Sequence, residues 1–554
     1  MKVSVISLNA KYVHLAPAPY ALGAGVLAFA RRSHEVVVID GVAGKDESGV
    51  LARAVSVAPH AVAFSVYIWN VEAVRRLLPR VRLLLPDAKI ILGGPEVSYA
   101  VEGTFSDMPE CDYILSGEGE ESFARLLDAI EEKGAVEGIP GCAYRTDGGV
   151  FVPTPVLGRG TPPSPLDFGY AEALRGRIAY LESSRGCPFS CAFCLSGRCG
   201  GVRFFDVERV KRDILSLANA DTRTVKLVDR TFNADRARAR EIWRFIMEKR
   251  ALGEIPPGVC FHFEIAGELL DEESMALLET APRGLFQLEI GLQSLNPETL
   301  RAISRAPVSA RLLSCVRRLV LAGNIHIHTD LIAGLPREDL ATFRLGFDQA
   351  FRLGAHMLQL GFLKLLHGAP MREEREKYPC AYGEKPPYTV TSTPVLSEGD
   401  LADIALCEMG CERLYNSGKY KRTLCEVLAP HVSPYTLFRD AGRALSALGL
   451  SYTLDDETKV LLDFFEAYLP RERVRDLLLW DHMARNPSCY TPKALRLEDP
   501  ALARIKRAMD EKHPRKTGVR RAVAILYTEG RVAFADYEEK DPVTGSYEVK
   551  TFVM

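Results

Sequence analysis

The sequence predicts an α/β chain with a doubly wound parallel sheet, then a partial (β/α)6 barrel, then a mainly helical carboxyl-terminal domain with a small terminal β-sheet. Apolar strand patterns alternate with amphipathic helix patterns up to about residue 375, which is typical of parallel sheets. Helical periodicity then replaces this alternation. A chain of 554 residues is longer than one hydrophobic core can accommodate, so several domains are expected. Their expected bounds are 1–140, a linker over 141–175, 176–375, and 376–554.

The first domain is predicted from five short apolar runs separated by helical patterns. Ligands on a doubly wound sheet bind at the carboxyl ends of its strands. Small residues follow three of these strands and would let a backbone approach a large ligand closely. The strands are expected at Val3–Leu8, Val36–Ile39, Ala61–Val66, Lys89–Leu92 and Tyr113–Leu115, and the residues that follow them include Ser65, Gly93, Gly94 and Gly117.

The linker is indicated by its composition. Residues 152–165 contain five prolines and two glycines, and proline at this density continues neither a helix nor a central strand. Such a segment can run as a semi-rigid strap over a neighbouring domain.

Six further strand patterns, each followed by a helical one, predict the partial barrel, a smaller relative of the eight-unit barrel. They are expected at Ile178–Glu182, Thr224–Val228, Cys260–Glu264, Phe286–Ile290, His326–Leu331 and Met357–Phe362. In the last domain, helices are expected at Gly399–Tyr415, Tyr435–Leu448 and Asp456–Ala467. The runs Val532–Tyr537 and Tyr547–Phe552 are expected to form a hairpin around the turn at 541–545.

Composition excludes some functions. The formal net charge of −2 provides no basic field for nucleic acid or an anionic membrane. No apolar run reaches the roughly 18 residues of a membrane helix, and no leader pattern precedes the first strand. Thirteen cysteines scattered over a long chain do not form a disulfide framework, so a reducing cytoplasm is the expected location.

The most informative motif is the CxxxCxxC run formed by Cys187, Cys191 and Cys194. Iron–sulfur clusters usually take four cysteines, so three thiolates would leave one iron of a 4Fe-4S cluster open to another ligand. The alternatives are coincidence or a zinc site. Zinc would require a fourth Cys or His at matched spacing, and the nearby Cys199 does not belong to a second C-x-x-C pair.

This loop resembles that of the radical SAM superfamily, in which S-adenosylmethionine (SAM) chelates the open iron. Phe193 matches the aromatic residue that the family places before the last cysteine. By the same resemblance, polar groups and a glycine at the barrel mouth would bind the SAM ammonium, ribose, carboxylate and adenine. These residues are Asp229, Asn233, Glu264, Glu289, Gln293, Ser294 and Gly334. The alternative is that the charged residues are simply solvated or paired.

The first 140 residues resemble the flavodoxin-like cobalamin-binding domain that precedes many radical SAM barrels. The resemblance implies that Ser65, Gly93, Gly94 and Gly117 pack around the cofactor's nucleotide tail, and Glu118 is also expected to bind the cofactor. The run Asp-x-His-x-x-Gly is absent, so cobalamin without a histidine lower ligand is expected, and His14 does not fit that pattern. Tyr67 and Trp69 are candidates to cover the lower face. A plain nucleotide-binding module is the alternative, with Trp69 in ordinary packing.

Together these resemblances imply a cobalamin-dependent radical SAM enzyme that forms a 5′-deoxyadenosyl radical by reductive cleavage of SAM. Methylation of an unactivated carbon in a small-molecule substrate is favoured, with anaerobic chemistry and an external electron donor such as flavodoxin or ferredoxin. Three alternatives remain: cyclisation, rearrangement or oxidation without methyl transfer; a cobalamin sensor with a non-catalytic barrel; and a radical SAM enzyme with an empty amino-terminal module.

A second group of cysteines lies in the carboxyl-terminal domain. Cys407 and Cys411 are one helical turn apart and could form a ligand set with Cys425. The favoured interpretation is that they are inert helix cysteines.

Overall fold

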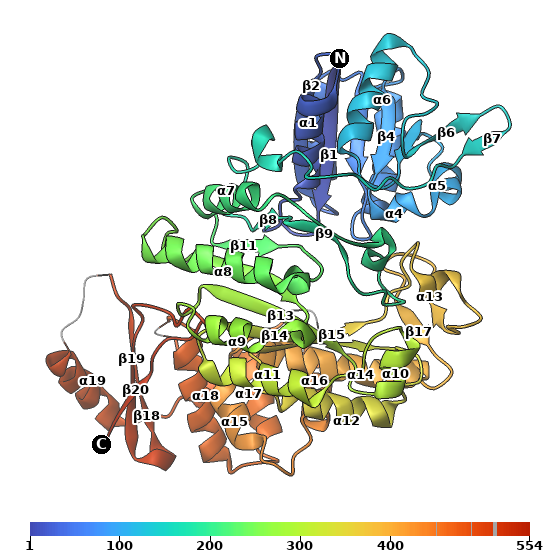
Figure 1. Cartoon of the computed structure of the whole chain (residues 1–554). Helices are drawn as coiled ribbons and strands as arrows, with labels where there is room; N and C mark the ends of the chain where they lie inside the picture. Colours follow the sequence, from blue (N-terminus) through green and yellow to red (C-terminus); the bar gives the residue numbers. More distant parts are fainter. Residues whose placement is uncertain (450, 489, 514–517, 554) are drawn as a thin grey trace. The chain divides into compact units, whose positions relative to one another are not determined.

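The computed structural model describes residues 1–449, 451–488, 490–513 and 518–553. The chain forms two compact units. Their helices and strands are labelled in Figure 1. The first contains Met1–Leu277, Ile303–Arg305 and Leu363–Thr391, and the second contains Leu278–Ala302, Ala306–Phe362 and Ser392–Met554.

The first unit begins with a seven-stranded sheet in the order β2-β1-β3-β4-β5-β6-β7. The five amino-terminal strands are parallel and confirm the predicted doubly wound sheet. Because the strand order changes direction between β1 and β3, the carboxyl ends of these two strands form the switch point where ligands bind in such sheets. The parallel strands are β1 (Lys2–Asn9), β2 (Glu35–Val42), β3 (Ala61–Ser65), β4 (Lys89–Gly93) and β5 (Tyr113–Leu115).

Two antiparallel strands extend this sheet into the segment expected to be a linker. β6 (Cys142–Thr146) pairs with β5, and β7 (Gly149–Phe151) pairs with β6. The rings of Tyr144 and Phe151 stack across this hairpin with centroids 5.1 Å apart, a cross-strand contact that favours the pairing. The proline-rich part of the segment follows these strands.

Helices cover both faces of the sheet, because alternate residues of each strand point to opposite sides. Ile6 and Leu8 pack with α2 (Glu47–Ser56), α3 (Val71–Leu84), α4 (Pro95–Ser98) and α5 (Val101–Asp107). Val3 and Val5 pack with α1 (Ala18–Phe29) and α6 (Glu120–Glu132).

The first unit also contains three parallel strands of the predicted barrel, in the order β12-β11-β8. A short antiparallel hairpin, β9 paired with β10, follows β8 and had not been predicted. The elements of this part are β8 (Ala179–Leu181), β9 (Ser184–Cys187), β10 (Gly201–Phe204), α7 (Val207–Ala218), β11 (Thr224–Leu227), α8 (Arg236–Ala251) and β12 (Cys260–Ile265). The helix α9 (Glu272–Glu279) begins in this unit and ends in the second. The later segment Leu363–Thr391 carries α13 (Pro370–Glu373) and β16 (Ala381–Tyr382), and β17 (Val390–Ser392) begins at its end.

The second unit holds three further parallel strands, β13 (Phe286–Gln293), β14 (His326–Ala333) and β15 (Met357–Phe362). Its other elements up to β15 are α10 (Pro297–Ala302), α11 (Ala310–Ala322) and α12 (Leu340–Phe351). All six predicted barrel strands are therefore present as strands.

The carboxyl-terminal part of the second unit is helical and ends in a small antiparallel sheet, drawn in red in Figure 1. The three predicted helices are confirmed, and the last two strands pair antiparallel as predicted. The helices are α14 (Glu398–Gly410), α15 (Lys421–Val427), α16 (Pro434–Ser446), α17 (Leu454–Phe465), α18 (Arg471–Arg485) and α19 (Pro500–Lys512), and the strands are β18 (Arg521–Leu526), β19 (Arg531–Asp536) and β20 (Lys550–Val553).

Helices α14 and α16 cross in backbone contact. A Cβ on Gly410 would lie 2.0 Å from the carbonyl oxygen of Phe438, and one on Gly442 would lie 1.9 Å from that of Leu406. Only glycine fits at these two positions, so the crossing depends on both.

In the part of the chain that the structure describes, no helix has the length and apolar character needed to cross a membrane.

Candidate functional site

The three cysteines of the CxxxCxxC motif lie within the β9–β10 hairpin. Cys187 is the last residue of β9 and pairs with Gly201, while Cys191 and Cys194 lie in the connection between the strands. Gly186 has a φ of 96°, and a Cβ there would lie 2.0 Å from the carbonyl oxygen of Gly201. The glycine before Cys187 is therefore required for the two strands to approach each other.

Polar groups surround the three thiols. The Thr231 hydroxyl lies 3.3 Å from the sulfur of Cys187, and the backbone N–H of Ser196 donates to Cys194 Sγ at 3.4 Å. The guanidinium of Arg305 lies 3.8 Å from Cys191 Sγ. Burial raises the pKa of Cys191, although the charge of Arg305 opposes this shift. Three sulfur donors beside one cation fit a cluster bound by thiolates.

Backbone hydrogen bonds fix the loop itself. The N–H of Ala192 donates to the carbonyl of Ile303, and the carbonyl of Ala192 accepts from the N–H of Met371, both at 3.0 Å. Phe193 is half-buried in this loop. The cysteine loop is thus held on both sides by segments distant in sequence.

Asp229 and Asn233, predicted to bind the SAM ammonium, are buried and already paired. Asp229 accepts from the Ser183 N–H and hydroxyl at 3.0 and 2.7 Å, and from the Ser184 hydroxyl at 2.5 Å. Burial raises the pKa of Asp229 to about 6. Asn233 exchanges two 2.8 Å hydrogen bonds with the backbone of Ala266. These contacts join strand ends, so both residues organise the mouth, and SAM contact stays a prediction.

Glu264 lies at the mouth of the same half of the barrel, 3.5 Å from the Lys226 ammonium and 3.6 Å from the Arg230 guanidinium. It is only partly buried. A carboxylate beside two cations at this position is available to a polar ligand, although contact with SAM remains a prediction.

The other predicted SAM residues lie in the second unit: Glu289 within β13, Gln293 and Ser294 at its carboxyl end, and Gly334 directly after β14. Glu289 pairs in register with His328, and Gln293 has a φ of 67° at a bulge in β13. Gly334 has a φ of 89°, so glycine suits the turn after β14. Ser294 donates to the carboxylate of Glu338 at 2.5 Å.

Glu338 was not among the predicted site residues. Its Oε1 accepts from Ser294, while its buried Oε2 has no hydrogen-bond partner in the described part of the chain. Burial raises the pKa of Glu338 to about 7. The sequence feature that could have identified Glu338 is its position four residues after Gly334, in the loop that follows β14.

At the switch point of the first sheet, Tyr67 and Trp69 form an aromatic platform. Their rings are parallel within 6°, with centroids 4.3 Å apart. The Trp69 indole N–H donates to the Leu8 carbonyl at 3.2 Å, while 48% of the residue remains exposed. Asn70, which the sequence analysis did not select, donates to the carbonyls of Leu8 and Ser65 at 3.0 Å and joins β1 to β3. A fixed, flat and exposed aromatic surface fits the face of a planar macrocycle.

His14 contacts the barrel. Its Nδ1 lies 2.6 Å from the Tyr180 hydroxyl, and His14 forms an isolated bridge with Ile178. Burial, followed by the charges of Lys11 and Lys226, lowers the pKa of His14. The contact with Tyr180 involves only Nδ1 of His14, and the expectation that His14 has no lower-ligand role stays a prediction.

The small residues at the strand ends also have structural roles. A Cβ on Gly94 would lie 2.4 Å from the Val66 carbonyl oxygen, and one on Gly117 would lie 2.3 Å from the backbone of Val156. Gly93 has room for a Cβ, whose nearest neighbour would lie 3.5 Å away. Ser65 is buried at the end of β3. Close backbone packing therefore explains Gly94 and Gly117, and cofactor contact stays a prediction for all four.

Glu118, expected to contact cobalamin, accepts hydrogen bonds from two arginines of the cysteine hairpin. Its Oε2 lies 2.6 Å from both the Arg185 and Arg203 guanidinium groups, and its Oε1 accepts from the Gly158 N–H at 2.9 Å. Burial alone raises the pKa of Glu118, but the two arginines and Gly158 reverse this effect, so the net shift is downward.

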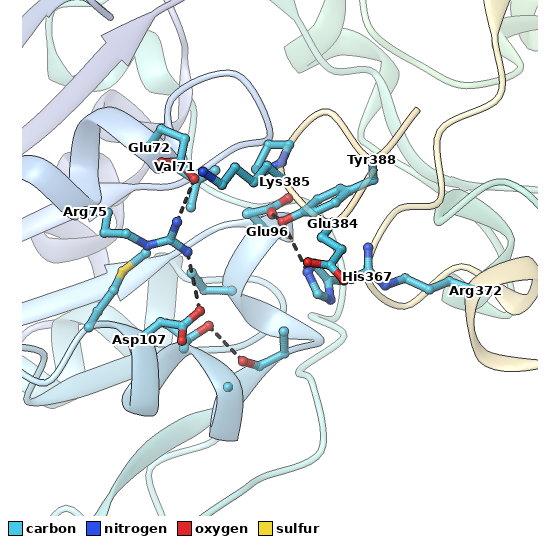
Figure 2. A pocket seen from close by; sticks show the side chains of 16 residues that line it. Val71, Glu72, Arg75, Glu96, Asp107, His367, Arg372, Glu384, Lys385 and Tyr388 are labelled. Carbon is cyan, nitrogen blue, oxygen red and sulfur yellow. Dashed lines mark hydrogen bonds and ion pairs between the residues drawn. The ribbon is translucent and has the colours of Figure 1, made fainter. Parts of the chain in front are cut away.

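Segment Leu363–Thr391 packs against the loop after β4 and encloses a cavity of about 350 Å³ with α3, α4 and α5 (Figure 2). The Tyr388 hydroxyl donates to the Glu96 carboxyl at 2.5 Å, and His367 lies 3.3 Å from that hydroxyl. Arg75 is paired with Glu72 at 2.6 Å. The Tyr388–Glu96 hydrogen bond therefore connects the segment to α4 of the amino-terminal sheet domain.

The cysteines of the carboxyl-terminal domain differ in exposure. Cys407 and Cys411 are buried, and Cys425 is exposed. Burial raises the pKa of both buried thiols, which favours their neutral form and the inert interpretation.

Family models match three stretches of the chain. The radical SAM superfamily matches residues 181–345, the B12 binding domain matches 19–127, and a protein family of unknown function (DUF4080) matches 376–529. These matches follow the order inferred from the motifs, and the last covers the region in which no motif was recognised.

Two curated relatives are 28% identical to the chain. One is the 2-(S-pantetheinyl)-carbapenam-3-carboxylate methyltransferase of Streptantibioticus cattleyicolor, matched over 54% of this chain and 46% of the relative. The other is the cobalamin-dependent radical SAM methyltransferase TokK of Streptomyces tokunonensis, matched over 58% of this chain and 50% of the relative. The chain thus spans about half the length of these relatives.

Two solved structures share the fold. The radical SAM methyltransferase TsrM from Kitasatospora setae, solved with cobalamin and a 4Fe-4S cluster bound, is 21% identical with a TM-score of 0.57, over 70% of this chain and 76% of that one. OxsB is a cobalamin-dependent SAM radical enzyme solved with aqua-cobalamin and SAM bound. It is 15% identical with a TM-score of 0.59, and the match covers 93% of this chain and 81% of OxsB. At these identities the likeness confirms the fold.

Proposed function

We propose that this chain, which belongs to the radical SAM enzymes that carry a B12-binding domain, is a cobalamin-dependent enzyme that methylates an unactivated carbon of a small molecule. The observation that carries the proposal is the presence, in one compact unit, of the three-cysteine hairpin and the Tyr67–Trp69 platform. The methyltransferase names of the curated relatives favour methylation over other radical reactions.

Cys187, Cys191 and Cys194 would hold a 4Fe-4S cluster, and the platform would face cobalamin. When bound, the cluster would supply the electron for reductive cleavage of SAM and cobalamin would carry the methyl group. Thr231 and the Ser196 N–H orient two of the thiolates, and Arg305 partly balances their negative charge. Trp69 covers one face of its ligand with an anchored ring that excludes water.

We also propose that the polar groups at the barrel mouth bind SAM. Glu264 is the best placed in the first unit, because Asp229 and Asn233 are already hydrogen-bonded. In the second unit, Glu289, Gln293, Ser294 and Gly334 remain the candidates. Substrate identity would be set by side chains outside these cofactor loops.

An external one-electron donor such as flavodoxin or ferredoxin would reduce the enzyme, and the chemistry would require anaerobic conditions. A reducing cytoplasm suits a protein whose described cysteines are all free. The net charge of −2 supports a small-molecule substrate over nucleic acid.

The proposal is tested with trideuteromethyl SAM, a chemical reductant, hydroxocobalamin and candidate substrates under anaerobic conditions. Methylation through a substrate radical consumes two SAM molecules, so labelled product should appear with comparable amounts of S-adenosylhomocysteine and 5′-deoxyadenosine. Verified turnover that yields 5′-deoxyadenosine without S-adenosylhomocysteine would reject methyl transfer and favour cyclisation, rearrangement or oxidation.

A further inference from the structure

The hairpin that carries Cys187 presents two arginines side by side. Arg185 of β9 lies directly opposite Arg203 of β10, so both side chains emerge on the same face of the hairpin. Like charges in directly opposite positions destabilise a strand pair. The hairpin therefore needs a neighbouring anion.

The loop after β5 supplies the carboxylate that the two arginines share. Glu118 Oε2 accepts hydrogen bonds from both guanidinium groups at 2.6 Å. Arg185 also donates to Glu120, at the start of α6, and to Glu182, both at 2.6 Å, whereas Glu118 is the carboxylate that contacts both arginines. The side chains of Glu118, Arg185 and Arg203 are only 17%, 20% and 23% exposed. Charge-assisted hydrogen bonds with this degree of burial are stronger than surface ion pairs.

Glu118 is itself held in place by the chain on both sides. Its N–H donates to the Val156 carbonyl at 3.0 Å, and its Oε1 accepts from the Gly158 N–H at 2.9 Å. The adjacent Gly117 has a φ of 92° and packs against the Val156 backbone. A rigid loop therefore presents a fixed carboxylate to a hairpin that ends at Cys187.

We propose that Glu118 is a positioning residue that fixes the cysteine hairpin, through Arg185 and Arg203, against the amino-terminal sheet. The inference rests on the proposed function, in which the hairpin holds the cluster and the sheet holds cobalamin. Arg185 is two residues from Cys187, so loss of Glu118 would shift the first cluster ligand relative to the cobalamin loops. Displacement of reacting groups by about 1 Å can slow a reaction about 100-fold.

The first experiment needs no cofactor. Hydrogen exchange of the full-length apo-protein is compared for the wild type, Glu118→Gln, Arg203→Lys and Glu121→Gln. Glu121 is the matched control, because it is exposed on α6 and pairs only with Arg125 of the same helix among the described residues. Faster exchange over residues 184–204 is expected in Glu118→Gln, a smaller increase in Arg203→Lys, and none in Glu121→Gln.

The second experiment identifies the role of charge. Glu118→Gln leaves two opposed guanidinium groups without their shared carboxylate, so adding Arg203→Gln should relieve the repulsion. The double variant should recover at least half of the protection lost in Glu118→Gln. If the double variant instead loses more protection from hydrogen exchange than Glu118→Gln does, the charge-based assignment is wrong.

The third experiment measures the two cofactors together in reconstituted protein. In Glu118→Gln we expect normal iron and cobalamin content, but a weaker effect of the reduced cluster on the relaxation of the cobalt(II) paramagnetic signal. With added SAM and reduced cobalamin, S-adenosylhomocysteine release should fall about tenfold or more. Release of 5′-deoxyadenosine should change little.

The outcomes separate this inference from the proposed function. A wild-type protein that binds neither cofactor rejects the proposed function, and the apo-protein exchange still decides the hairpin contact. Weaker cobalamin binding with unchanged relaxation in the loaded fraction would make Glu118 a cofactor contact and overturn the positioning role. Unchanged exchange and unchanged relaxation in Glu118→Gln would also reject it.

Discussion

The indole of Trp69 lies parallel to the phenol ring of Tyr67, with the ring centroids 4.3 Å apart, at the switch point of the amino-terminal sheet. The indole N–H is bound to the Leu8 carbonyl, so the exposed face of Trp69 has a fixed orientation. Stacked aromatic pairs are stabilised beyond their buried area, which keeps this surface flat in the absence of a ligand.

Trp69→Ala should therefore weaken cobalamin binding or change the cobalt reduction potential. Spectrophotometric titration with hydroxocobalamin and redox titration measure these effects. Tyr67→Leu is the matched variant, because it removes the stacking partner and keeps the indole. Binding and potential that remain at wild-type values in Trp69→Ala would reject contact with the cofactor.

His14→Ala should leave the cobalt paramagnetic spectrum of bound cobalamin unchanged, because His14 does not lie in an Asp-x-His-x-x-Gly run and no such run occurs in the sequence. Continuous-wave electron paramagnetic resonance of the cobalt(II) form tests this directly. Nitrogen hyperfine splitting that is present in the wild type and lost in His14→Ala would show that His14 is a cobalt ligand.

Replacement of Cys187, Cys191 and Cys194 together by alanine should abolish the brown chromophore and the reductive cleavage of SAM. The visible spectrum, iron content and 5′-deoxyadenosine yield after anaerobic reconstitution are the measurements. Cys425→Ser is the control, because Cys425 is exposed and distant in sequence from the motif. An intact four-iron cluster in the triple variant would contradict the ligand assignment.

The buried carboxyl of Glu338 should make the stability of its unit depend on pH. Burial raises its pKa to about 7 in the folded chain, so between about pH 4.5 and 7 the folded state holds a proton that the unfolded state has lost. The free energy of unfolding should fall with rising pH over this window, by up to about 3 kcal/mol.

Glu338→Gln should remove this pH dependence. The free energy of unfolding of Glu338→Gln should therefore exceed that of the wild type by more at pH 8 than at pH 5. Urea unfolding at both pH values provides the measurement, and Glu298→Gln, at an exposed position, is the control. An equal effect of Glu338→Gln at the two pH values would mean that Glu338 ionises normally.

Gly442→Ala should destabilise the α14–α16 pair, because its methyl group would lie 1.9 Å from the Leu406 carbonyl oxygen. Overpacking of this kind costs about 1–3 kcal/mol and often forces helices apart. Gly399→Ala is the control on α14, since its Cβ would meet its nearest neighbour at 3.7 Å and alanine favours a helix. Thermal unfolding followed by circular dichroism distinguishes the two; equal melting temperatures would contradict the close crossing.

Local patterns allowed much of the fold to be predicted. The parallel strands of the first sheet and the six barrel strands were visible because buried strands are short apolar runs bounded by turn residues. The hairpin β9–β10 was missed because Gly186 and the intervening cysteines interrupt the alternation of apolar and polar residues by which a strand is predicted. Strands β6 and β7 were missed because a proline-rich stretch follows them directly.

The sequence by itself identified the three cysteines as a candidate ligand set, because they lie within a run of eight residues that a compact loop brings together. It also determined the order of the regions along the chain. Only the tertiary structure decided which polar groups are already paired: Asp229 with Ser183 and Ser184, and Glu118 with Arg185 and Arg203. Glu118 and Arg203 are 85 residues apart. Local propensity carries no information about such a contact, because it forms only when packing of the sheet and hairpin brings the two charges together.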